Sequence, residues 1–395
     1  MQKPLRRLSV APMEGITNFP MRLWLHLVSQ PSSMTTPFLR VTRVFPEKAL
    51  PRDFAPELLE LRGILPYELI PQYISGDPSQ FLRACELLPE DVAPLIEINC
   101  GCPSPNSLGK LAGSGMLHDP QFFGKSIAFL SRSLGDGRLA VKMRLGMESP
   151  EEFPDLLHSI SDLPLGRLTV HARTRRQGYR GLASWDALKL TTQTISPSVL
   201  ASGDVLGMDS LQKLEEFAPH IHGAMIGRGV LRNPWIFEEL RSNAPVKIQG
   251  LTLINALFCY ALLQELWQTN PQKLLNRIKQ GRIGSACLVD FAAWEKLTVE
   301  LTGLIFGVPF LLTRSDDLVS KAISSVAMGR LRLVWSYFRS SLPADFAAPA
   351  IMRSKHLEDF FGRIFQALTS KYQLEDQITV GHQTEWDVRF AGARG

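Results

Sequence analysis

Short runs of apolar residues recur along the first 240 residues, separated by longer helix-like stretches. The runs occupy residues 8–12, 37–41, 67–73, 95–99, 139–143, 167–171, 198–202 and 223–226. Most lie roughly 25–40 residues apart, which is the spacing of strand–helix units. Continuous apolar runs suit strands that are buried on both faces of a parallel sheet. Eight units in this length predict a (β/α)8 TIM barrel over residues 1–240.

The alternative is an open, doubly wound sheet, whose G-x-G-x-x-G fingerprint does not follow the first run. The pattern changes near Gln249, where helical periodicity replaces the short runs. Helices are predicted over residues 251–267, 272–279, 292–303, 319–340 and 357–371. We therefore expect an all-helical domain over residues 241–395, with a polar, loose tail after Gln373.

The amino-acid composition limits the class of protein to which the chain can belong. The chain has 395 residues, of which 45% are hydrophobic and 21% are charged, as in globular proteins. No run reaches the ~18 apolar residues of a membrane span, and no apolar core follows the basic residues at the start. Five cysteines, an odd number, do not form a disulfide framework. These observations predict a soluble, cytoplasmic protein, which we expect to be monomeric.

The net charge of +5 comes entirely from the second part of the chain. Residues 1–240 hold 25 basic and 25 acidic side chains, whereas residues 241–395 hold 18 and 13. A neutral body with a basic helical part indicates a polyanionic partner. A solvated helical surface with a chance excess of charge explains the same counts equally well.

Reactive side chains follow the predicted strands at their C-terminal ends, where barrel enzymes place their active sites. The residues at these positions are Met13, Glu14, Arg40, Gln72, Asn99, Cys100, Cys102, Lys142, Arg144, His171, Arg173, Ser202, Gly203, Asp204, Gly227, Arg228 and Gly229. Loops seven and eight, SGD and GRG, suit a phosphate because glycine lets backbone N–H groups approach it closely. Ordinary glycine turns are the alternative interpretation.

The loop after the fourth strand, Asn-Cys-Gly-Cys-Pro-Ser, is the least generic segment. Its C-x-C spacing is too short for a structural zinc site without a second cysteine pair, and we expect no metal. A disulfide between such near neighbours would be strained. What remains is a reactive thiol at the barrel mouth, for which we favour Cys102. Cys100 is expected to be packed, as are Cys85, Cys259 and Cys287.

Six segments together resemble a known family. They are APMEGITN from Ala11, EINCGCPS from Glu97, VKMRLG from Val141, TVHARTRRQGYRG from Thr169, SGDV from Ser202 and MIGRGVLRNPWIF from Met225. In this order they resemble the dihydrouridine synthases, flavoenzymes that reduce uridines in tRNA. Residues 37–44 and 329–339 are most similar to the bacterial C-type subfamily, which acts on the D-loop uridine at position 16.

The resemblance implies a role for each matching residue. Cys102 would be the proton donor to the uracil ring. The residues expected to bind FMN are Pro12, Met13, Glu14, Gln72, Lys142, His171, Ser202, Gly203, Asp204, Gly227 and Arg228. Within this set, Gln72 and Lys142 would contact the isoalloxazine ring and the glycine loops the phosphate. The residues expected to contact the substrate nucleotide or the rest of the tRNA are Arg40, Asn99, Arg144, Gln177, Arg330 and Arg332.

The implied reaction uses NADPH, or NADH, to reduce FMN. Hydride then passes to C6 of the uracil, and a cysteine thiol protonates C5. Cysteine suits this task because ordinary thiols titrate at about 8.5 and keep their proton at neutral pH. The uridine must first leave its stack in the tRNA.

Two departures from the family's pattern leave alternatives open. Ser202 stands where the family commonly has asparagine. Residues 273–320 resemble an insertion, in which Arg277 begins a rival match to the RNA-binding segment. The alternative functions are an FMN-dependent reductase of a free pyrimidine, similar to dihydroorotate dehydrogenases, and a tRNA-binding protein without catalysis.

Overall fold

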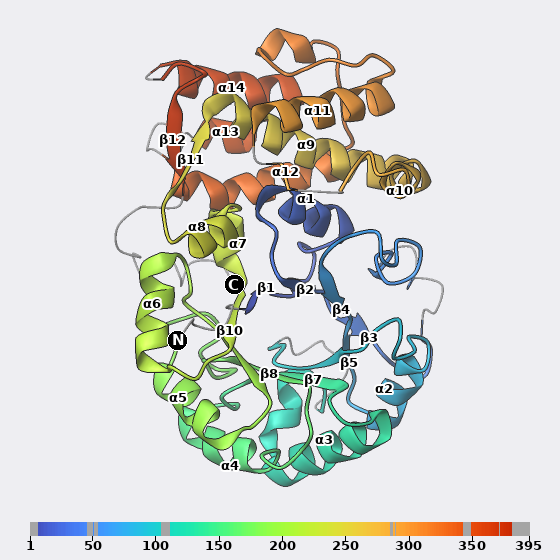
Figure 1. The fold of residues 1–395 in the computed structure, drawn as a ribbon, viewed down its shortest axis with the longest axis vertical. Coiled ribbons are helices and arrows are strands. Elements are labelled where there is room, and N and C mark those ends of the chain that lie inside the picture. Colours follow the sequence, from blue (N-terminus) through green and yellow to red (C-terminus); the bar gives the residue numbers. More distant parts are fainter. Residues whose placement is uncertain are drawn as a thin grey trace.

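The larger part of the molecule is a parallel β-barrel surrounded by helices (Figure 1). The computed structural model describes residues 7–45, 50, 54–103, 111–284, 287–288, 290–342, 349–370 and 372–380. The strands of the barrel are β1 (Arg7–Val10), β2 (Ser33–Thr35), β3 (Leu39–Arg40), β4 (Glu68–Ile70), β5 (Gln72–Ile74), β6 (Ile96–Cys100), β7 (Leu139–Arg144), β8 (Arg167–His171), β9 (Ser198–Ser202) and β10 (Gly223–Ile226).

The ten strand segments occupy eight positions, because the second and third strands are each divided. β2 pairs with β4, β3 pairs with β5, and only Pro71 separates β4 from β5. Pro71 has no N–H to donate, and its carbonyl accepts a hydrogen bond from the N–H of Glu97 at 2.9 Å. Since β4 continues into β5, the strand order from β3 round to β4 closes on itself. The predicted barrel is confirmed.

The helices of the barrel are α1 (Phe19–Ser29), α2 (Pro78–Cys85), α3 (Pro120–Leu134), α4 (Phe153–His158), α5 (Trp185–Thr194), α6 (Met208–Phe217), α7 (Arg228–Arg232) and α8 (Ile236–Ser242). Local sequence explains where several of them begin. The side chains of Asn18, Asp77 and Asp119 accept hydrogen bonds from the first turns of α1, α2 and α3, each of which carries an early proline.

Polar side chains fill much of the barrel interior. Side chains alternate between the two faces of a strand, so Glu97 and Asn99 of β6 point the same way, as do Arg167 and His171 of β8. Arg167 reaches past β7 to Glu97 of β6, and both are almost completely buried. TIM barrels usually pack bulky branched residues in this space. The polar interior therefore reaches from the middle of the barrel to the ends of the strands.

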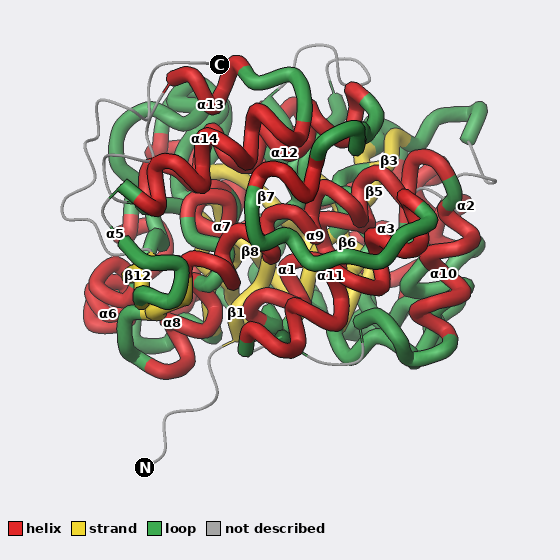
Figure 2. The backbone as a smooth tube through the Cα atoms, turned by 90° about the horizontal axis from the view of Figure 1, so that it is seen from above, coloured by secondary structure: helices red, strands yellow, loops and turns green. Residues whose placement is uncertain are grey.

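The rest of the chain is mainly helical and packs beside α1, α7 and α8 (Figure 1). Its helices are α9 (Gly250–Thr269), α10 (Pro271–Lys279), α11 (Phe291–Phe306), α12 (Ser325–Phe338), α13 (Pro349–Arg353) and α14 (Leu357–Thr369). Figure 2 views the molecule from this side, with the strands lying behind the helices. α9 is long and apolar enough to cross a membrane, but 89% of its apolar window is buried, so it is the core helix of this part.

The expectation of an all-helical second part needs correction. β11 (Val246–Gln249) pairs antiparallel with β12 (Gln377–Val380). Ile378 and Val380 are buried, so the segment after Gln373 is anchored at least as far as residue 380. α12 also begins six residues later than predicted, because the Ser324 side chain caps the helix there.

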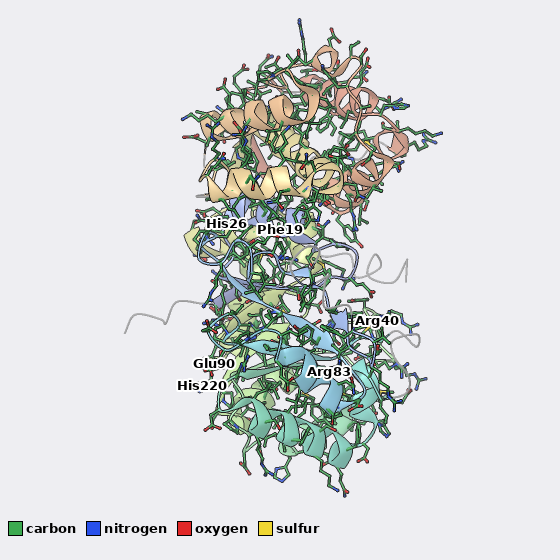
Figure 3. The ribbon with its side chains drawn as sticks, turned by 90° about the vertical axis from the view of Figure 1, so that its right-hand side faces the viewer. Phe19, His26, Arg40, Arg83, Glu90 and His220 are labelled. Atoms are coloured by element: carbon green, nitrogen blue, oxygen red, sulfur yellow. The ribbon has the colours of Figure 1, made fainter. Side chains whose placement is uncertain are left out.

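The two parts share an extensive apolar contact between α1 and α9. The indole N–H of Trp24 donates to the carbonyl of Ala256 at 2.8 Å. The rings of Phe19 and Trp267 lie 4.8 Å apart, edge to face. Figure 3 shows Phe19 and His26 at this boundary. The helical part is therefore packed against the first helix of the barrel and close to the loop that precedes it.

Candidate active site

Cys102 lies on a turn that the last polar side chain of β6 holds in place. The Asn99 Oδ1 atom accepts hydrogen bonds from the N–H groups of Gly101 and Cys102, at 3.0 and 2.9 Å. The carbonyl of Cys102 accepts two more, from the N–H and the hydroxyl of Ser114, at 3.1 and 2.8 Å. The Cys102 side chain is half-buried at the end of the strand. The next part of the loop, residues 104–110, lies outside the described residues.

The other cysteines differ from Cys102 in their surroundings. Cys100 is completely buried, its sulfur lies 3.7 Å from that of Met116, and burial raises the pKa of its thiol far above the ordinary value. Cys85 and Cys259 are also buried, as expected. Cys287 is not, because it is half-exposed where the two parts of the chain meet. At the barrel mouth Cys102 is thus the accessible thiol of the C-x-C pair.

Arg144, the last residue of β7, ties the Cys102 turn to the loop after β8. Its guanidinium donates to the carbonyls of Gly101 at 2.7 Å, Thr174 at 3.0 Å and Gly178 at 2.9 Å. Only 2% of Arg144 is exposed. The geometry therefore assigns it a positioning role that sequence reasoning missed, while its contact with the substrate stays a prediction.

Gln72 and Asn99 form a pair of amides at the top of the barrel interior. Asn99 Nδ2 donates to Gln72 Oε1 at 2.8 Å, and Gln72 Nε2 donates to Glu97 Oε1 at 2.7 Å. Each amide group keeps further hydrogen-bonding capacity, because an NH2 group carries two hydrogens and an amide oxygen two lone pairs. The predicted contact of Gln72 with a flavin ring is compatible with this arrangement.

Lys142 of β7 is half-buried between Cys102 and the polar interior. Burial is the main reason that the pKa of its ammonium group falls to about 8. The charges of Arg144 and Arg167 act in the same direction, and the negative charge of Glu97 acts against them. Lys142 makes no hydrogen bond to another of the described side chains or carbonyls, so its charge is left for a ligand.

The imidazole of His171 is surrounded by positively charged side chains. Burial, together with Arg144, Lys142, Arg173 and Arg228, holds the pKa of the His171 imidazole well below its usual range. The ring is therefore neutral at neutral pH and acts as a hydrogen-bonding group. Cations gathered in one buried place attract an anion, and this place is where the phosphate was predicted.

The acidic side chain in the loop after β9 is bonded within the protein, which leaves the backbone of this loop as the part suited to the predicted phosphate. Asp204 accepts two hydrogen bonds from Arg173, at 2.6 and 2.8 Å, and one from the N–H of Ala183 at 2.6 Å. Arg173 Nη1 is buried without a hydrogen-bond partner among the described residues. A Cβ on Gly203, whose φ is 122°, would lie 3.4 Å from this atom and 3.6 Å from the His171 ring. Ser202 beside it is 7% exposed.

The loop after β10 completes this region. A Cβ on Gly227 would meet Ala11 and the sulfur of Met13, at 3.6 and 3.9 Å. Arg228, the first residue of α7, lies with its guanidinium 4.6 Å from the ring centre of Tyr179. The glycine backbone, the cations and the unpaired Arg173 nitrogen fit the phosphate end of a mononucleotide cofactor.

The remaining predicted residues surround this centre. Pro12 and Met13 are half-buried, and the N–H of Met13 donates to the hydroxyl of Thr17 at 2.9 Å. Glu14 is exposed and lies 3.9 Å from Arg40 in a surface ion pair, and Figure 3 shows Arg40 at the edge of the barrel. Such exposed pairs contribute little stability. The predicted ligand contacts of these side chains stay predictions.

Gln177 and the two arginines of α12 lie further out. Gln177 Oε1 accepts from the N–H of Thr174 at 2.7 Å and so shapes the loop after β8. Arg330 reaches the first barrel loop, because a Cβ on Gly15 would lie 4.0 Å from its Nη1 atom. Arg332 is half-buried on the same helix. The structure thus brings Arg330 to the barrel mouth, while Gln177 mainly supports the loop.

The Lys142 pKa predicts a pH dependence. Below about pH 8 the ammonium is charged and could stabilise the negative charge that the flavin implied by the resemblance would gain on reduction; above it the charge is lost. We expect anaerobic flavin reduction by NADPH to slow as pH rises through this value, by up to about tenfold per pH unit. In the Lys142→Met variant, flavin reduction should be slower at pH 7, and its pH profile should lack this inflection. An unchanged inflection in the variant would assign the titration to another group.

The family model and the relatives compared by sequence agree on one family. The model of the family described as "Dihydrouridine synthase (Dus)" matches residues 9–280. A tRNA-dihydrouridine(16) synthase of Haemophilus ducreyi is 30% identical over 66% of this chain and 80% of its own length. One of Escherichia coli O157:H7 is 27% identical over 82% of this chain and 100% of its own length. The solved structure of the old yellow enzyme from Trypanosoma cruzi covers 61% of this chain and 89% of its own, with a TM-score of 0.40 and 12% identity.

Proposed function

The chain belongs to the dihydrouridine synthase family and is a tRNA-dihydrouridine synthase, and from this premise we propose the details of its reaction. The enzyme reduces the C5–C6 double bond of the D-loop uridine at position 16, with FMN as its cofactor and NADPH as the electron donor. Relatives from Haemophilus ducreyi and Escherichia coli that carry this position in their names support the choice of uridine. It acts as a monomer.

The proposal rests mainly on the accessible thiol of Cys102, which lies on a fixed turn beside buried cations. Asn99 and Arg144 hold the Cys102 turn from two sides. Lys142 lies close enough to interact electrostatically with the thiol. Cys102 therefore stands where it can deliver a proton to C5 of a uracil ring bound at the barrel mouth. Because a positioned acid must be rigid to be effective, these hydrogen bonds contribute directly to the reaction.

The residues present also fit FMN. Gly203, Gly227, Arg228 and the unpaired Arg173 nitrogen would hold the phosphate. Lys142 and Gln72 would hold the ring, with His171 as a neutral hydrogen-bonding group between the two ends. When bound, FMN supplies the transfer of two electrons from the nicotinamide to the uracil.

The tRNA would be bound by α12 more than by α10. Arg277 pairs with Glu300 at 3.1 Å and Lys279 with Glu60 at 3.2 Å, so these charges of α10 are neutralised within the protein. Among the described residues, Arg330 and Arg332 have no carboxylate partner within salt-bridge distance. An unpaired cation gains more from a phosphate than one that must first leave a partner.

The substrate test compares tRNA with free uridine. Protein reduced anaerobically with NADPH should be reoxidised by tRNA that lacks dihydrouridine and not by uridine or orotate at similar concentrations. Rapid reoxidation by the free pyrimidines would favour the alternative function of a small-molecule reductase. Tight tRNA binding by a protein that takes up no FMN would favour a binding protein without catalysis.

Replacing Arg228 with alanine should weaken FMN retention. The expected loss is about 1.5–3 kcal/mol, the range for a hydrogen bond to a charged group, or roughly 10- to 100-fold in Kd. Fluorescence titration of the apoprotein measures it. Arg363→Ala, which removes an exposed arginine paired with Asp359 on α14, is the control and should retain FMN normally. Equal affinity in the two variants would remove Arg228 from the phosphate site.

Arg330→Ala should flatten the salt dependence of tRNA binding. Removing one interaction between a cation and a phosphate reduces the slope of log K against log salt by roughly 0.7–0.9. We expect little change for Arg332→Ala, because residues two apart on a helix do not face the same side. We expect none for Arg277→Ala, because Glu300 already neutralises Arg277. FMN reduction should be normal in all three. A flatter slope for Arg277→Ala alone would move the RNA contact into residues 273–320.

A further inference from the structure

A buried carboxylate at the centre of the barrel has no part in the proposed chemistry. Glu97 of β6 is completely buried, and each of its oxygens accepts from a different donor. Oε2 accepts from Arg167 Nη2 at 2.7 Å, and Oε1 accepts from Gln72 Nε2 at 2.7 Å. Glu97 forms an ion pair with Arg167, and a carboxylate in such a pair can only accept hydrogen bonds.

Because Glu97 can only accept, it fixes the orientation of the Gln72 side-chain amide and, through it, that of Asn99. Gln72 must turn its NH2 group toward Glu97 and its oxygen toward Asn99. Asn99 must then turn its NH2 group toward Gln72, where Nδ2 and Oε1 lie 2.8 Å apart. Its oxygen is left to accept from the N–H groups of Gly101 and Cys102. Each step fixes the next, from the ion pair to the turn that carries the thiol.

An amide alone has no preferred direction in such a chain. If position 97 carried glutamine, its oxygen would satisfy Arg167 and its NH2 group would face Gln72. Gln72 and then Asn99 would have to reverse, and Asn99 would present its NH2 group to the N–H groups of the Cys102 turn. Two donors that face each other cannot bond, so the turn would lose its support.

We propose that Glu97 is a positioning residue for uridine reduction, because its charge sets the direction of the hydrogen bonds that hold the Cys102 turn. The role in uridine reduction rests on the proposed function, whereas the control of the turn does not. Glu97 reaches the thiol through Gln72 and Asn99 and does not touch the substrate.

The first test is Glu97→Gln, with Glu57→Gln as the matched control. Glu57 pairs with Arg22 at 2.7 Å, and both side chains are nearly as buried as Glu97 and Arg167, but they lie outside the site. Uridine reduction should fall by about 10²-fold in Glu97→Gln, as expected for a reacting group that is misplaced by about 1 Å. In Glu57→Gln it should change no more than the loss of stability explains.

The second readout does not depend on activity. The rate at which iodoacetamide alkylates Cys102, followed by peptide mass spectrometry, reports opening of the turn, and half-exposed Cys287 serves as an internal reference. We expect this rate to rise at least about threefold relative to Cys287 in Glu97→Gln, because local opening exposes the thiol. It should be unchanged in Glu57→Gln.

The decisive variant is an exchange of two side chains, Gln72→Glu together with Glu97→Gln. It keeps the net charge and moves the carboxylate one position along the hydrogen-bond chain, from residue 97 to residue 72. A carboxylate at position 72 accepts from the NH2 groups on both sides, so Asn99 again points its NH2 group inward and its oxygen toward the turn. Cys102 alkylation should return to the wild-type rate. If Glu97→Gln does not fold, the exchange variant is compared with the wild-type protein instead, and a raised Cys102 alkylation rate in the exchange variant would then contradict the proposal.

The proposal is overturned if Glu97→Gln alters Cys102 alkylation no more than Glu57→Gln, or if the exchange leaves the rate as high as the single change does. Failure of the wild-type protein to reduce uridine in tRNA would instead contradict the proposed function. The alkylation comparison would still decide whether Glu97 controls the turn.

Discussion

Replacing Cys102 with alanine should lower uridine reduction in tRNA by about 10²–10⁴-fold, the usual contribution of a positioned general acid. Flavin reduction by NADPH should be normal, because the thiol is needed only when the uracil is protonated. Stopped-flow measurement of the two half-reactions separates these effects. The backbone contacts of the turn come from Asn99 and Ser114 and do not involve the thiol, so the loop should keep its shape.

Cys100→Ala is the control for this prediction. Cys100 is two residues away but completely buried against Met116, so its removal should mainly affect stability. A larger loss of uridine reduction in Cys100→Ala than in Cys102→Ala would show that the proton donor was assigned to the wrong cysteine.

Arg144→Met should lower uridine reduction by about 10²-fold, because the Cys102 turn and the loop after β8 lose their common support. Methionine keeps much of the side-chain volume but leaves the carbonyls of Gly101, Thr174 and Gly178 without this donor. Each buried carbonyl that stays unsatisfied costs about 1–3 kcal/mol, so the thermal midpoint should fall as well.

The control for Arg144 is Arg176→Met on the neighbouring loop. Arg176 is exposed and pairs with Glu148 at 3.4 Å, so its loss should change neither activity nor stability noticeably. Normal uridine reduction in Arg144→Met, together with a normal thermal midpoint, would contradict the positioning role.

Strands were predicted well where the sequence carries a continuous apolar run. β8, β9 and β10 have the predicted bounds. The second strand was predicted only in part: β3 lies within the predicted residues 37–41, but the segment Ser33–Thr35 was missed. That segment contains one apolar residue and owes its place to pairing with β1 and β4. β11 and β12 were missed for a similar reason: each is stable only against the other, and they are far apart in the sequence.

Only part of the candidate site could be predicted from the sequence. Residues at strand ends were found because barrels place their chemistry there. Glu97 and Arg167 were missed because they lie within strands, although charged residues in otherwise apolar runs were a visible signal. Their pairing past β7 depends on strand order. The sequence likewise could not separate Arg277 from Arg330, because Glu300, which neutralises Arg277, is distant along the chain.

The most direct test of the account is to map the product. Transfer RNA that lacks dihydrouridine is incubated with this protein, FMN and NADPH, and each D-loop uridine is then examined for reduction. We expect dihydrouridine at position 16, formed by the wild-type protein and not by Cys102→Ala. Reduction at another position, or tRNA left unreduced by a protein that binds FMN and oxidises NADPH, would contradict it.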